Sequence, residues 1–69
     1  MTKHTKKILE LLLKKPRLTP TMIRKTLGFS RSYMAIILAI LLEVGFVETV
    51  VRGVYVTSDH GKAWLSTQG

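Results

Sequence analysis

Side chains that donate hydrogen bonds follow one another at a single point of the sequence, just after a glycine. They are Ser30, Arg31, Ser32 and Tyr33. Hydroxyl and guanidinium donors beside a helix N-terminus suit phosphate oxygens, and arginine also binds guanine through two hydrogen bonds. The chemistry that these residues favour is binding of a phosphate-rich ligand. The alternative is structural: Ser30 only caps a helix and Arg31 is only solvated.

The residues that most often carry catalysis or bind metals are not arranged for either task. His4 and His60 are far apart in the chain, the sequence has no cysteine, and no carboxylate cluster has metal-ligand spacing. Asp59 precedes His60, but it lies at an expected helix start, where the helix dipole favours an acidic residue. The sequence therefore predicts a protein that is not an enzyme, with no cofactor, no metal and no small-molecule substrate.

The charge of the chain is strongly positive and unevenly placed. The net charge is +7, and 46% of the 69 residues are hydrophobic, which excludes disorder. Nine of the 11 Lys and Arg residues lie in residues 1–31, which contain one acidic residue, Glu10. An anion-binding surface must therefore be built mainly by the first half of the chain.

Size and hydropathy limit the setting in which the protein works. A chain this short buries only about 60% of the surface that its unfolded form exposes, so self-association is a common stabilising device, and we expect a homodimer. The apolar run from Met34 to Leu42 has nine residues, whereas a membrane-spanning helix needs about 20. The N-terminus has no small-residue cleavage site. A cytoplasmic protein without a membrane partner is predicted.

The local signals predict four helices and a hairpin. Thr19-Pro20 is a typical helix start, Gly28 and Ser30 favour a tight turn between two helices, and Pro16 is expected to end the first helix. Arg52-Gly53 lies between two β-branched runs and favours a hairpin turn. The predicted helices are 3–15, 20–27, 31–44 and 59–66, and the predicted strands are 46–51 and 54–57.

This order of elements is typical of a winged helix-turn-helix. The run LTPTMIRKTLGFSRSYMAIILAILLEVGFVE resembles small prokaryotic winged-helix transcription regulators from their second helix into the wing, and VYVTSDHGKAWL resembles their closing strand and helix. The resemblance implies an α+β fold over residues 1–69, with a three-helix core, a two-stranded β wing and a short C-terminal helix. It also implies a homodimer that binds double-stranded DNA, with its third helix in the major groove and its wing on the flanking backbone or minor groove.

The same resemblance assigns roles to individual residues. It places in the core Met34, Leu38, Leu41, Val44, Phe46 and Val47, with Ile23 and Leu27 opposite them. Second-helix residues and the wing tip are expected to contact the DNA backbone or minor groove, although a solvated cationic face and an outward turn residue are the alternatives. The predicted DNA-binding residues are Arg17, Arg24, Lys25, Ser30, Arg31, Ser32, Tyr33 and Arg52. Tyr55 and Trp64 are interpreted as packing residues.

The third helix departs from this pattern at three apolar positions. Ile36, Ala39 and Ile40 occupy sites that commonly carry polar or basic side chains, and their spacing puts them on one stripe beside the core stripe. The stripe is expected to be buried, either against a second copy of the chain or against the chain's own terminal helices. Two other functions remain open: a winged helix used for protein–protein assembly, and membrane-surface binding by the Leu-rich first helix.

Overall fold

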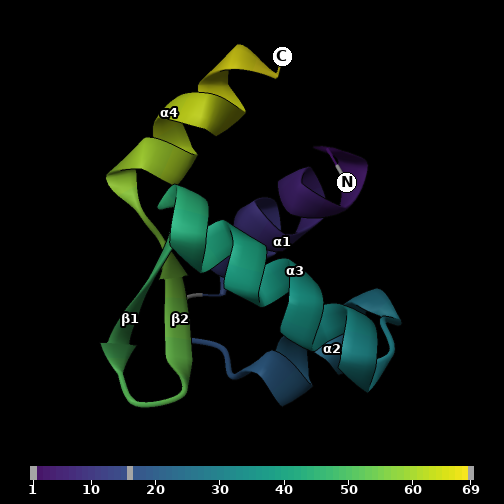
Figure 1. The fold of residues 1–69 in the computed structure, drawn as a ribbon. Coiled ribbons are helices and arrows are strands. Elements are labelled where there is room, and N and C mark those ends of the chain that lie inside the picture. The colour runs from purple at the N-terminus through teal and green to yellow at the C-terminus, as the bar shows by residue number, and fades with distance from the viewer. Residues whose placement is uncertain (1, 16, 69) are drawn as a thin grey trace.

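The fold is a three-helix cluster with a β-hairpin on one side and a short helix after it (Figure 1). The computed structural model describes residues 2–15 and 17–68. The elements are α1 (Thr2–Lys14), α2 (Pro20–Leu27), α3 (Arg31–Val44), β1 (Val47–Val51), β2 (Val54–Thr57) and α4 (Asp59–Thr67). The predicted winged helix-turn-helix is confirmed, with boundaries that shift by one residue at several ends. Pro16, predicted to end the first helix, lies outside the described residues.

The helix-turn-helix forms because both helices begin at a capping side chain and a glycine ends the first of them two residues before the second cap. The amide of Met22 donates to the Thr19 hydroxyl at the start of α2, and the amide of Tyr33 donates to the Ser30 hydroxyl at the start of α3. Gly28 takes φ 76°, a left-handed conformation that glycine adopts at little cost. The chain bends by 117° between α2 and α3, so the two helices point in clearly different directions.

One face of α3 forms the centre of the core. Met34, Ile37, Leu38 and Leu41 are buried there. They pack with Ile8, Leu9 and Leu12 of α1. The other residues of the core cluster come from the neighbouring segments and are Leu18, Ile23 and Val47. The large fully buried side chains are thus contributed mainly by α1 and α3.

Two sequence-based core assignments need correction. Val44 was expected in the core but is 47% exposed, whereas Ile37, which was not assigned to it, is fully buried. The helix turns by about 100° per residue, so Ile37 and Val44, seven residues apart, point in nearly the same direction. Ile37 lies in the middle of α3 and is buried, whereas Val44 is the last residue of the helix and is exposed. Leu27 and Phe46 are only partly buried and pack against the edge of the core.

The wing is attached to the helices by hydrogen bonds at its base. β1 and β2 pair antiparallel from Val47 opposite Thr57 to Val51 opposite Val54, with an irregularity between Thr49 and Val51. The amide of Tyr55 donates to the carbonyl of Leu18, just before α2, over 3.1 Å. The Thr57 hydroxyl donates to the carbonyl of Leu9 in α1. The base of the wing therefore has a fixed position relative to α1 and α2.

The helix α4 is joined to the end of α3 through one serine. The Ser58 hydroxyl donates to the carbonyl of Gly45 and accepts a hydrogen bond from the amide of Gly61, which caps α4. The Phe46 ring packs against Trp64, with 5.3 Å between ring centroids. Trp64 is accordingly a packing residue, as expected.

Within the described residues, no single helix is long and apolar enough to cross a membrane. The helices α2 and α3 have the required length and hydrophobicity only when they are counted together, across their sharp bend.

Candidate nucleic-acid interface

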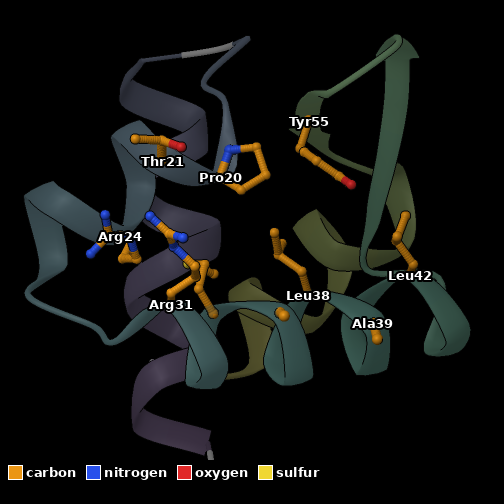
Figure 2. Close-up of a pocket in the computed structure, with 10 residues that line it drawn as sticks. Pro20, Thr21, Arg24, Arg31, Leu38, Ala39, Leu42 and Tyr55 are labelled. Atoms are coloured by element: carbon orange, nitrogen blue, oxygen red, sulfur yellow. The ribbon is translucent and has the colours of Figure 1, made fainter.

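A hollow lies where α2, α3 and the wing meet, and we call it the arginine hollow (Figure 2). Its volume is about 470 Å³. Pro20 and Tyr55 stand on one side of it in Figure 2, and Leu38, Ala39 and Leu42 of α3 stand on the other. The residues lining it are Pro20, Thr21, Arg24, Arg31, Met34, Ala35, Leu38, Ala39, Leu42 and Tyr55. Three segments that are distant in sequence thus build one concave face.

The charge of the arginine hollow is entirely positive. Arg24 lines it from the second turn of α2 and Arg31 from the start of α3, and no lining residue is acidic. Thr21 and Tyr55 add hydroxyl groups. Among the described residues, 2–15 and 17–68, the single ion pair joins Lys62 to Asp59 in α4. Within these residues, neither arginine of the hollow is therefore neutralised by a carboxylate. Such a site suits an anion that accepts several hydrogen bonds, such as a phosphate.

Ser30 and Tyr33, also predicted to bind DNA, lie away from the arginine hollow. They line a second, shallower depression with His4 and Phe29. The Tyr33 hydroxyl hydrogen-bonds to Nδ1 of His4 over 2.6 Å, and the rings of His4, Phe29 and Tyr33 pack edge to face or tilted. Tyr33 therefore has a packing partner in α1 that sequence reasoning did not anticipate, because His4 precedes it by 29 residues.

The other predicted contact residues are exposed at separate points of the surface. Lys25 lies on α2, Ser32 on the first turn of α3, and Arg52 in the turn between β1 and β2. Arg17 is exposed between α1 and α2 and has φ 66°, a left-handed conformation that a non-glycine residue rarely adopts. The structure brings Arg24 and Arg31 together, whereas Lys25, Ser32 and Arg52 do not share a hollow with them.

The apolar stripe of α3 is not covered by the chain itself. Ile36 is 59% exposed and Ile40 is 37% exposed, and Ala39 is exposed as well. The expectation that the terminal helices bury this stripe is wrong, because all three of its side chains remain exposed in the folded chain. The remaining alternative is contact with a second copy of the chain.

The two lining residues with hydroxyl groups, Thr21 and Tyr55, were not among the predicted contact residues. Thr21 carries no signal beyond its place at the start of α2. Tyr55 was interpreted as a packing residue, and it does pack against the core, but it also lines the hollow because the Leu18–Tyr55 pairing holds β2 beside α2. That pairing joins residues 37 positions apart and leaves no local pattern in the sequence.

The described residues do not form the ligand clusters that metal ions need. Across residues 2–15 and 17–68, no three His, Cys, Asp or Glu side chains come close enough to hold a metal ion.

Comparisons with known proteins agree with this fold. The chain superposes on the solved structure of the transcriptional repressor CouR, bound to p-coumaroyl-CoA, with a TM-score of 0.80 and 30% sequence identity. The match covers 87% of this chain and 44% of the CouR chain, so this chain spans less than half the length of that repressor. No protein-family model and no curated protein sequence matches the chain.

The class of the protein follows from the fold and this likeness together. It is a winged helix-turn-helix protein of the kind found in transcription regulators. CouR is described as a transcriptional repressor, which agrees with the resemblance to transcription regulators found in the sequence.

Proposed function

We propose that residues 1–69 act as one DNA-binding domain of a transcription regulator, with α3 in the major groove and the wing on the flanking backbone or minor groove. The observation that carries this proposal is the arginine hollow. A DNA strand that passes between a major-groove helix and a minor-groove wing has its phosphates between these two elements. Arg24 and the Tyr55 hydroxyl line that space and would donate to a phosphate, Arg31 adds a second positive charge to the lining, and no carboxylate is present there. The likeness to the repressor CouR supports the same assignment.

The predicted contact residues divide into two roles under this proposal. Arg24 and Lys25 on α2 bind phosphates, because the first helix of a helix-turn-helix crosses the backbone. Arg31 and Ser32, on the first turn of α3, reach base edges. Ser30 and Tyr33 lie at the border of the groove, and Arg52 in the wing turn meets the minor groove or its phosphates, where a narrow groove attracts arginine.

Arg17 supports the proposal through its backbone. A left-handed conformation costs a non-glycine residue about 1–2 kcal/mol, so glycine would be favoured at φ 66° if the side chain had no use. An arginine kept at such a position, exposed and beside the start of α2, is suited to the flanking DNA backbone.

We also propose a homodimer, because many large apolar side chains remain exposed. More than a third of the surface is accessible for Leu13, Met22, Ile36, Ile40, Leu42, Val44, Val50 and Val51. Ile40 and Val44 are one turn apart on the same side of α3 and are the proposed beginning of the seam between two copies. Binding of duplex DNA would agree with the cytoplasmic location expected from the sequence.

The test is a salt titration of binding to a duplex of mixed sequence. With about four to six phosphate contacts per protomer, the logarithm of the binding constant should fall against the logarithm of salt concentration with a slope of about −0.9 per contact. Arg17→Gly removes one contact without backbone strain, so its slope should be smaller in magnitude by about 0.9 per protomer. Lys62→Ala, in α4, is the matched control and should keep the parent slope. A binding constant that stays the same from low to moderate salt would contradict the proposal.

The exposed apolar residues of α3 favour one other function, protein–protein assembly. A module of that kind would retain its self-association or its partner and show no salt-dependent affinity for duplex DNA, so the same titration separates the two functions.

A further inference from the structure

The exposed face of α3 has almost no hydrogen-bonding side chains in the middle of its length. Ala35, Ile36 and Ala39 form this part of the surface, which we call the apolar strip, and all three are exposed. Ser32 borders the strip toward the start of the helix and Glu43 toward its end. A helix that reads bases through this face has few donors or acceptors for their polar edges.

The apolar strip is continuous with the arginine hollow. Ala35 and Ala39 line the hollow together with Arg24 and Arg31, and Ile36 follows Ala35 directly on the outer side of the helix. A molecule that covers the strip must therefore also bind the two guanidinium groups beside the strip. Duplex DNA meets both requirements, because it offers phosphates beside a groove that contains apolar groups.

The apolar group that B-DNA displays in its major groove is the methyl group of thymine. Every base pair also shows polar atoms in this groove, but cytosine has only a hydrogen where thymine has its methyl group, so an A·T pair offers the strip more apolar surface than a G·C pair. Alanine side chains are small enough to let the helix approach the base pairs closely, and Ile36, 59% exposed, extends beyond them. Complementarity between this strip and a groove is therefore highest where thymines lie under it.

We infer that the protein reads DNA through thymine methyl groups, with Ile36 as the main reading residue and Ala35 and Ala39 admitting it to the base pairs. Ala35 to Ala39 spans about 6 Å along the helix axis, which corresponds to about two base pairs of 3.4 Å. One or two methyl groups per protomer are thus within reach. This inference rests on the proposed DNA binding and adds the chemical class of sequence that is preferred.

The test replaces thymine by uracil, which removes the methyl group and keeps every base-pairing atom. Binding of the full chain is measured on a duplex containing only A·T pairs and on the same duplex with uracil in place of thymine. Burial of one methyl group contributes about 0.8 kcal/mol, so the uracil duplex should bind about fourfold more weakly for one contact and about fifteenfold for two. A G·C duplex should bind more tightly when its cytosines carry a 5-methyl group, because that methyl occupies the same place in the groove.

Two variants test whether the preference for thymine over uracil depends on the apolar strip. Ile36→Ala should bind the thymine and uracil duplexes with nearly equal affinity. Arg52→Ala changes the wing and should keep the parent ratio while lowering both affinities. Because Ile36 is exposed, Ile36→Ala should fold like the parent chain, so a change in its DNA affinity reports the loss of the side chain. The melting temperature of the Ile36→Ala variant checks this directly.

Each other outcome has a separate meaning. Salt-dependent binding with equal affinity for the thymine and uracil duplexes overturns the methyl inference and leaves the proposed DNA binding intact. Absence of binding to every duplex overturns both. If Ile36→Ala keeps the thymine preference, or if it halves the mass of the protein in sedimentation, the strip is not the reader, and in the second case it is a seam between two copies.

Discussion

The two faces of α3 are built from the same kinds of residue, but their surroundings differ completely. Ile36 and Ile37 are neighbours of identical type, and their side chains are 59% and 0% exposed. Ile37 belongs to the core cluster together with apolar residues of α1 and α2, whereas Ile36 points to the exposed side of α3. Hydrophobicity alone thus does not tell a core face from a binding face; the positions of the other helices do.

The largest expected difference between the two faces is in folding stability. Ile37→Ala leaves a cavity in a fully packed core and should lower the free energy of unfolding by about 2–5 kcal/mol. Ile36→Ala removes an exposed side chain and should change it by no more than about 0.5 kcal/mol. Urea denaturation of both variants at one protein concentration measures the contrast. Similar losses in the two variants would mean that Ile36 is covered in solution.

The second expected effect concerns association at the C-terminal half of the exposed side. If Ile40 lies in a dimer seam, Ile40→Glu places a charge that would be desolvated only in the dimer, at a cost of several kcal/mol. Sedimentation should then show a folded monomer where the parent chain is a dimer. Glu48→Gln, on the exposed side of β1, is a control that should leave the mass unchanged. A parent chain that is already monomeric would remove the dimer proposal.

The third effect separates base reading from backbone contact. Arg31→Ala should cost about 1–3 kcal/mol on a preferred site and reduce discrimination among sequences, as expected for a base-edge contact. Arg52→Ala should weaken all sequences nearly equally, with a modest additional loss on A·T-rich flanks if the minor groove there is narrow. Titrations of both variants against a selected and a scrambled site measure this.

An equal loss for Arg31→Ala on both sites would assign this arginine to a phosphate. Its position beside Arg24 in the arginine hollow would then be its functional place, and discrimination would rest on the apolar strip. The thymine and uracil comparison can therefore be made in the Arg31→Ala background as well, where the methyl preference should persist.

Local features of the fold were predictable because they depend on a few consecutive residues. The caps at Thr19 and Ser30, the turn at Gly28 and the hairpin at Gly53 all formed as expected, since each one satisfies backbone groups or a positive φ within about four positions. The order of these elements was enough to predict the winged helix-turn-helix.

The surface of the candidate site was less predictable, because it depends on contacts between distant segments. The arginines were identifiable by type, but the meeting of Arg24 and Arg31 in one hollow depends on the angle between two helices. Tyr55 reaches the hollow through its backbone pairing with Leu18, and Tyr33 of α3 is hydrogen-bonded to His4 of α1. None of these contacts has a periodic signal in the chain.

The amino-acid sequence by itself determined the positive charge of the first half, the helix ends, the hairpin and the presence of more apolar residues on α3 than one core face needs. Only the tertiary structure decided which of those residues are surplus. It buries Ile37, exposes Val44, and leaves Ile36 and Ala39 uncovered beside two arginines. The physical reason is that burial depends on neighbours brought from other parts of the chain, and the residues of α1, α2 and β1 that enter the core cluster cover one face of α3.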